Sequence, residues 1–147
     1  MQPGDEAKTS PVAGLEHALE RYAEVAAVYL YGSTARGQAT PLSDVDLAVV
    51  LMPGVGQEER ARLQRRLLTG VGRALSGRRV DLRFLDDLPV AVRGRIVYEG
   101  VRVFERDAVV RLRQEVKARL EYHDFLAFER AGLGPGLAGL RRKLVHG

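Results

Sequence analysis

The chain has 147 residues, of which 46% are hydrophobic and 29% are charged, a balance typical of one globular domain rather than of a disordered protein. The 23 Lys and Arg residues outnumber the 19 Asp and Glu residues and give a formal net charge of +4. Because the chain has no cysteine, disulfide bonds, thiolate zinc sites and cysteine nucleophiles are excluded. No apolar run approaches the roughly 20 residues of a membrane-spanning helix, and residues 1–10 lack a signal-peptide stretch, so we expect a cytoplasmic protein.

Hydrophobic patterning predicts helices and strands along most of the chain. In chain order we expect a helix over 11–24, strands over 25–31 and 44–51, a helix over 57–75, a strand over 79–85, a short helix over about 89–98, an edge strand over 101–104 and a long helix over about 108–130. These elements predict an α/β fold, with a small mixed sheet, helices mainly on one face and an open cleft on the other. We expect this domain to span 11–131, between a tail at 1–10 and a Gly-rich, then basic tail at 132–147.

The last predicted helix is apolar over a wide arc. Its positions at helical spacing are Val109, Leu112, Val116, Leu120 and Phe128, joined by Tyr122 and Phe125. Two interpretations stay open for the arc of Tyr122, Phe125, Leu126 and Phe128. It completes the core, or part of it is a surface for a partner protein.

Three acidic residues stand in strands that are otherwise apolar. Asp44 and Asp46 are two residues apart in the second predicted strand, so their side chains face the same side. Two such carboxylates repel each other and lose hydration, and a hard divalent cation such as Mg²⁺ would offset this cost. Asp81 is a third acid of this kind, in the strand over 79–85. If these two strands are neighbours, we expect three carboxylates to converge and to hold two metal ions.

A polar loop follows the first predicted strand and begins with Gly32 and Ser33. A glycine lets the backbone approach a ligand closely, and the free N–H groups of a helix start bind phosphate. Ser33 adds a hydroxyl donor, and Arg36 lies one helical turn further on. Each residue alone also has a structural interpretation: Ser33 as a helix cap, Arg36 as a solvated charge, and Asp81 with Arg83 as an exposed polar pair.

The combined pattern resembles the DNA polymerase β nucleotidyltransferase superfamily over about residues 11–130. The matching residues read GSTARG from Gly32, SDVDL from Ser43, and VDL at 80–82. Within the superfamily the chain is similar to the minimal nucleotidyltransferases, in particular to the MntA-like antitoxins of HEPN–MNT toxin–antitoxin pairs. The resemblance implies a polymerase-β-like fold, metal binding by Asp44, Asp46 and Asp81, and triphosphate binding by Gly32 and Ser33.

The resemblance also implies a reaction and a partner. Family members transfer a nucleoside monophosphate, usually AMP from ATP, and release pyrophosphate. Asp81 would help to activate the incoming hydroxyl. In MntA-like members the acceptor is a tyrosine hydroxyl of a HEPN ribonuclease toxin, which the modification silences. We therefore expect a Mg²⁺-dependent enzyme that forms a hetero-oligomer with a HEPN toxin, without direct binding to nucleic acid or membrane.

Two other functions stay open. The chain could be a binding module that neutralises its partner by occlusion alone, with any nucleotide serving only to stabilise the fold. It could instead be a small-molecule nucleotidyltransferase of the aminoglycoside-modifying type. Such enzymes usually add a helical substrate domain, whereas only about 40 residues follow the predicted edge strand here, which favours an acceptor on a partner protein.

Overall fold

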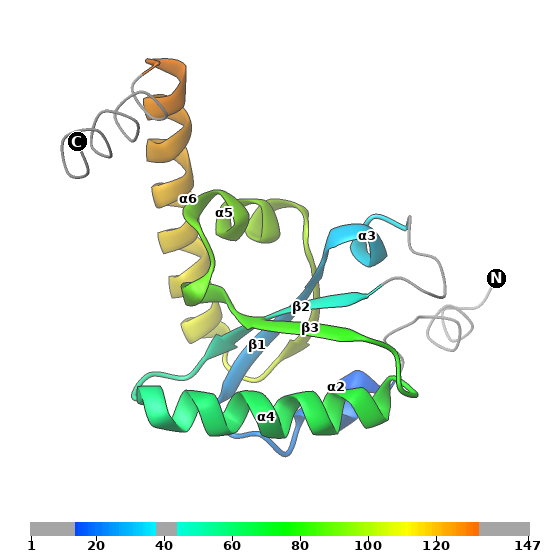
Figure 1. Ribbon diagram of the computed structural model, residues 1–147. Helices are drawn as coiled ribbons and strands as arrows, with labels where there is room; N and C mark the ends of the chain where they lie inside the picture. The colour runs from blue at the N-terminus through cyan, green and yellow to red at the C-terminus, as the bar shows by residue number, and fades with distance from the viewer. Residues whose placement is uncertain (1–13, 38–43, 133–147) are drawn as a thin grey trace, which may run out of the picture.

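The computed structural model describes residues 14–37 and 44–132. Four strands form one sheet in the order β3-β2-β1-β4: β1 (Val25–Tyr31), β2 (Val45–Leu51), β3 (Val80–Phe84) and β4 (Val101–Glu105). Strand β1 is antiparallel to β2 and β4, whereas β2 is parallel to β3. The predicted small mixed sheet is therefore confirmed, and β4 lies at its edge as expected (Figure 1).

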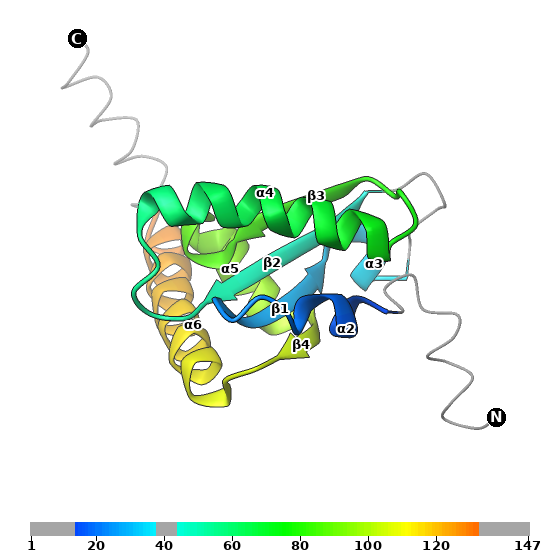
Figure 2. The same ribbon diagram turned by 90° about the horizontal axis from the view of Figure 1, so that it is seen from below.

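Helices cover both faces of this sheet. Helices α2 (Leu15–Leu19) and α4 (Gln57–Ala74) lie below the sheet in Figure 1 and in front of it in Figure 2, whereas α5 (Val90–Glu99) and α6 (Ala108–Arg130) lie on the other face. The prediction of helices mainly on one face is wrong in this respect. The physical reason is that β1 and β2 are apolar on both faces, so each face needs its own cover.

Two apolar clusters follow from this layering. The larger one joins α2 and α4 to the lower face of the sheet, through fully buried residues such as Leu19, Leu47 and Leu67. The smaller one joins α5 and α6 to the upper face, through Tyr29, Ile96 and Val110. On this upper face, the starts of β2 and β3 carry polar residues instead of apolar ones.

Most predicted elements match the observed ones closely. The first helix is the exception, because α2 ends at Leu19 and turns over residues 19–25 lead into β1. Its predicted start at residue 11 and the tail at 1–10 lie outside the described residues, as does the tail at 132–147 apart from Gly132, so the predicted domain limits stay predictions. No helix in the described part of the chain is both long and apolar enough to cross a membrane.

Helix α6 begins at a capped end and packs one side onto the sheet. The side chain of Asp107 accepts a hydrogen bond from Val110 N at 3.0 Å and so caps the helix. Tyr122 and Phe125 are half-buried and stack on each other, whereas Phe128 is exposed. The aromatic part of the arc is therefore divided between a half-buried pair, of which Tyr122 packs against Gly94 of α5, and the exposed Phe128.

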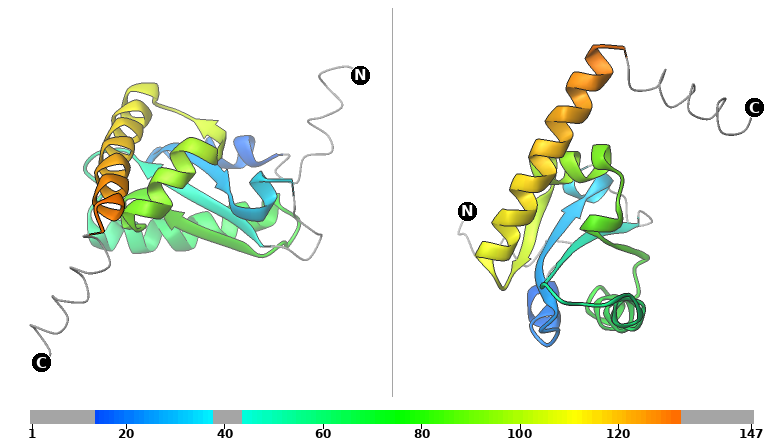
Figure 3. Two further views of the ribbon diagram at one scale, coloured as in Figure 1. Left: turned by 90° about the horizontal axis from the view of Figure 1, so that it is seen from above. Right: turned by 90° about the vertical axis from the view of Figure 1, so that its left-hand side faces the viewer.

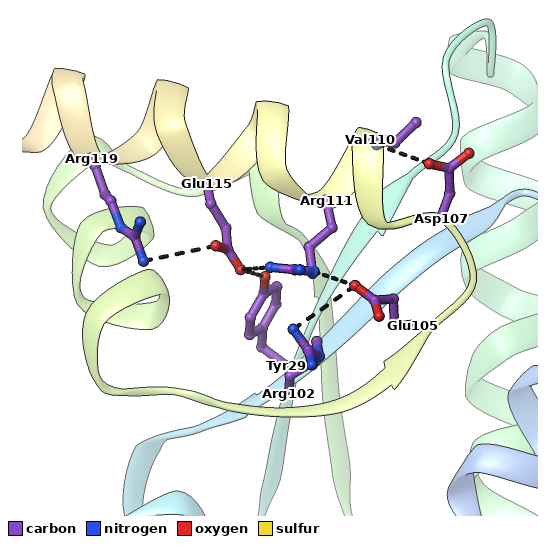
Figure 4. A network of polar contacts seen from close by, with 8 residues as sticks. All are labelled: Tyr29, Arg102, Glu105, Asp107, Val110, Arg111, Glu115 and Arg119. Atoms are coloured by element: carbon purple, nitrogen blue, oxygen red, sulfur yellow. Dashed lines mark hydrogen bonds and ion pairs between the residues drawn. The ribbon is translucent and has the colours of Figure 1, made fainter.

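A buried polar network holds α6 to the strands (Figure 4). The Tyr29 hydroxyl of β1 donates to Oε1 of Glu115, and Arg111 Nη1 donates to the same oxygen at 2.9 Å. Arg111 also pairs with Glu105 at the end of β4. Burial alone would raise the pKa of Glu115, but the hydrogen bonds from Tyr29 and Arg111 lower it below its usual value. Burial, with the carboxylate of Glu115 next to it, raises the pKa of Tyr29.

Candidate active site

Two of the three predicted acids are direct neighbours in the sheet. Strands β2 and β3 pair in parallel, and Asp46 is opposite Asp81 in their register. Parallel strands lie about 4.8 Å apart, so the two side chains stand next to each other on the face that α5 and α6 cover elsewhere. Asp44 comes directly before β2, on the same side as Asp46. The prediction that these strands are neighbours is confirmed.

Gly32 lies against the carboxylate of Asp46. It begins the short helix α3 (Gly32–Ala35) directly after β1, in the left-handed region with φ 73°. A Cβ atom on residue 32 would collide with Asp46 Oδ2. Only glycine meets both requirements, since it tolerates positive φ and has no side chain to displace the carboxylate. The glycine that was expected to face a ligand therefore faces an acid of the candidate site.

Negative charge is concentrated where β2 and β3 begin. Burial raises the pKa of Asp46, and the nearby charges of Asp81 and Asp44 raise it further, while Arg36 acts in the opposite direction. Burial and the charges of Asp46 and Asp81 likewise raise the pKa of Tyr31, the last residue of β1. Carboxylates crowded in this way are stabilised by a cation.

Arginine side chains form ion pairs with two of these acids. Arg83 Nε donates to Asp81 Oδ1 at 3.1 Å, and Arg79 Nε lies 4.0 Å from Asp44 Oδ1. Among residues 14–37 and 44–132, no three acidic or imidazole side chains are grouped so that they could hold a metal ion. Asp46 and Asp81 therefore lie side by side as expected, but Asp44, Asp46 and Asp81 do not form a group of three carboxylates that could bind a metal ion.

The donor chemistry nevertheless fits magnesium. All three side chains offer carboxylate oxygens, which are the ligands that Mg²⁺ prefers, and Mg²⁺ binds in proteins through one or two carboxylates plus substrate phosphates. Asp46 and Asp81, which are adjacent in the sheet, supply two such carboxylates. Asp81 would have to exchange its bond to Arg83 for the metal, and both groups are partly exposed, so this exchange needs no change in the core.

A hollow of about 170 Å³ opens between α3 and α5, and Gly32, which lies against Asp46, is one of its lining residues. Tyr31, Gly32 and Arg36 line one side of it. Arg95 and Glu99 of α5 line the other side. These two α5 residues were not predicted from the sequence, because no local pattern indicates that the short helix after β3 folds back over the end of β1. Ser33 lies in α3 next to Gly32 and is partly exposed.

The sequence also matches a family model. The model of the family described as "Polymerase beta, Nucleotidyltransferase" matches residues 14–109, which is more than half of the chain and contains every residue of the site. This chain belongs to that family. It is a nucleotidyltransferase, and the predicted membership is confirmed. A search of curated proteins finds no match.

Solved structures with the same fold include toxin–antitoxin complexes. A chain of a toxin–antitoxin complex with AMP-PNP has a TM-score of 0.61 and 21% identity, over 84% of this chain and 96% of that one. A chain of the MntA–HepT complex has a TM-score of 0.55 and 19% identity, over 86% and 97%. A chain of the complex between the tri-AMPylated HEPN toxin of Shewanella oneidensis and its MNT antitoxin has a TM-score of 0.56 and 18% identity, over 89% and 98%. These likenesses confirm the predicted polymerase-β-like fold.

Proposed function

We propose that this nucleotidyltransferase is the antitoxin of a toxin–antitoxin pair and transfers AMP from ATP to a tyrosine hydroxyl of a HEPN ribonuclease partner. Support comes from family membership and from the fold shared with chains of toxin–antitoxin complexes, one with AMP-PNP and one with an AMPylated HEPN toxin. The observation that carries the proposal is the pair Asp46 and Asp81, in register on adjacent strands and next to Gly32.

In this proposal Asp44, Asp46 and Asp81 hold Mg²⁺, while Gly32, Ser33 and Arg36 bind the triphosphate of ATP. When bound, the metal neutralises the charge that develops on the phosphate oxygens and lowers the pKa of a coordinated hydroxyl. The tyrosine oxygen forms a bond to the α-phosphorus of ATP. The bond from that phosphorus to the α,β-bridging oxygen breaks, and pyrophosphate leaves. The hydroxyl proton passes to the carboxylate of Asp81 and then to water.

The test is an intact-mass measurement of the HEPN partner after incubation with this protein, ATP and Mg²⁺. We expect mass increases in whole AMP units. The Asp46→Asn variant is expected to slow the transfer by about 100-fold or more, because metal-assisted charge stabilisation is worth several kcal/mol. The matched control is Glu58→Gln, an exposed carboxylate of α4. Unmodified partner with the wild-type protein would refute the proposal.

One observation favours the alternative, neutralisation by occlusion without chemistry. The ion pair between Asp81 and Arg83 leaves Asp81 engaged with a cation of the protein itself. The two functions differ in cells that express the toxin. If transfer is the function, Asp46→Asn loses protection; if occlusion is the function, Asp46→Asn protects as well as the wild type does.

A further inference from the structure

An apolar stripe runs along the side of α6 that faces away from the sheet. It consists of Val109, Leu112, Val116 and Leu120, which we call the outer stripe. Their exposed fractions are 59%, 48%, 51% and 63%, although all four are large aliphatic residues. They recur at intervals of three and four residues, so they form one continuous line on the helix surface. The sheet-facing side of α6 is formed by other residues, among them Val110, Glu115 and Ala118.

The outer stripe lies on an open side of the molecule. Figure 3, right, shows α6 at the front of the view, with no described helix or strand over it. The four residues line a shallow hollow together with Arg113 and Lys117. Exposed apolar surface that is continuous and bordered by polar residues is typical of a protein-interaction site.

The border of the stripe is positively charged. Arg113 and Lys117 follow one of its sides, and neither takes part in an ion pair with any residue in 14–37 or 44–132. Arg119 lies on its other side and pairs with Glu115, at 3.8 Å. A helix that docks here through an apolar face therefore meets the cations Arg113 and Lys117 along one border and, along the other, an arginine that Glu115 already pairs.

This charge pattern selects the occupant. If a second copy docked through the same stripe, the cations of one border would face cations of the other copy in either orientation of the two helices, which is unfavourable. Residues 133–147 of the chain carry Arg141, Arg142 and Lys143 beside their leucines, so they would also bring like charges together. A helix with acidic residues beside its apolar face matches both features of the surface.

We propose that the outer stripe of α6 is the docking surface for an amphipathic helix of the partner protein, with acidic residues flanking the apolar face of that helix. The identity of the partner, the HEPN protein, rests on the proposed function. Helix α6 lies on the opposite side of the molecule from the starts of β2 and β3 (Figures 1 and 3). Docking there leaves the hollow beside Gly32 accessible to ATP.

The experiment is calorimetric titration of the HEPN protein with full-length variants of this chain. The double variant Leu112→Ser with Val116→Ser removes the centre of the stripe, and Leu68→Ser on α4 is the matched control, since Leu68 is also an exposed leucine on a helix. We expect the double variant to weaken binding by about tenfold or more and the control to leave it unchanged. The charge variant Arg113→Glu with Lys117→Glu is expected to weaken binding more at low than at high ionic strength.

Equal affinity of the double variant and the Leu68→Ser control would overturn the docking proposal, while AMP transfer by both would leave the proposed function standing. Conversely, stripe-dependent binding without any AMP transfer would support docking and refute the chemistry. The double variant is also tested without partner. A loss of thermal stability larger than that of Leu68→Ser, or conversion of a dimer to a monomer in sedimentation, would overturn the proposal, because the stripe would then be covered by this chain itself or by a second copy.

Discussion

At the scale of single residues, the candidate site depends on the contact between Gly32 and Asp46. The left-handed backbone of Gly32 and the absence of a side chain allow the carboxylate to lie against α3. Since the same glycine begins the segment that is proposed to bind the triphosphate, the contact joins the proposed metal ligands to the proposed phosphate site. A change at residue 32 should therefore alter both stability and transfer.

We expect Gly32→Ala to destabilise the protein by about 1–3 kcal/mol, from backbone strain plus displacement of Asp46, and to abolish most AMP transfer. Gly37→Ala is the control, because Gly37 also has a positive φ, 69°, but no atom of the described residues lies within 4 Å of a Cβ there. Urea unfolding of both variants measures the strain that they share and the collision that only residue 32 adds. If Gly37→Ala impairs transfer as strongly as Gly32→Ala does, the contact with Asp46 is not the cause.

At the scale of elements, α6 is attached to the sheet by the polar network around Glu115 and to α5 by close helix packing. Glu115 is buried and contacts both Tyr29 of β1 and Arg111 of its own helix. Gly94 of α5 lies so close to Tyr122 that a Cβ would collide with its ring. Two different interactions therefore hold the helix that carries the outer stripe.

Glu115→Gln is expected to lower the free energy of unfolding at pH 7 by about 1–3 kcal/mol, because Arg111 loses a charged partner in a buried position. The folded state lowers the pKa of Glu115, so its contribution to stability is present above the unfolded pKa of about 4.3 and is lost as the pH falls through the lower folded value. The stability difference between wild type and variant should shrink as the pH falls below about 4. Denaturant unfolding across this range checks it, with Asp124→Asn as the control; a constant difference would contradict it.

Gly94→Ala is expected to destabilise the protein by about 1–3 kcal/mol, although alanine is the better helix former, because the added methyl group meets the ring of Tyr122. Gly72→Ala is the matched substitution in α4, where no described atom lies within 4 Å of the added methyl group, and should stabilise by up to about 1 kcal/mol. Thermal unfolding compares the two. A stabilising effect at residue 94 would mean that α5 and α6 move apart at little cost.

At the scale of the whole molecule, the proposed chemistry and the proposed docking surface are at opposite ends of the fold. The acids lie at the start of β2 and β3, whereas α6 crosses the other end of the sheet (Figure 1). The order β3-β2-β1-β4 creates this separation, because it brings the acid-bearing strands together on one side and connects α6 through the opposite edge strand.

The two proposed activities should therefore be separable. We expect Asp46→Asn to bind the HEPN protein with an affinity within about twofold of wild type, since mutations at distant sites rarely couple. The double variant Leu112→Ser with Val116→Ser should bind AMP-PNP as well as the wild type does. Titrations of both variants with both ligands complete the comparison. Loss of partner binding in Asp46→Asn would show that the acids contribute to the affinity for the partner, beyond the approach of the acceptor tyrosine that the transfer requires.

The sequence by itself determined the elements and the identity of the acids. Strand and helix periodicities are local, so β1, β2, α4 and α6 were predicted within about a residue, and Asp44 and Asp46 were identified because acids in an apolar strand are costly. The motif from Gly32 to Leu47 indicated the nucleotidyltransferase family. These signals depend on residues that are close together along the chain.

Only the tertiary structure decided what depends on distant segments. The register of β2 on β3 brought Asp46 opposite Asp81, while Asp81 took Arg83 as its partner. Periodicity alone could not tell which side of α6 would face the sheet. The outer stripe is exposed because α5 and the side of α6 that carries Glu115 cover this face of the sheet. Non-local pairing sets these outcomes, because a side chain's burial depends on what packs against it rather than on its own chemistry.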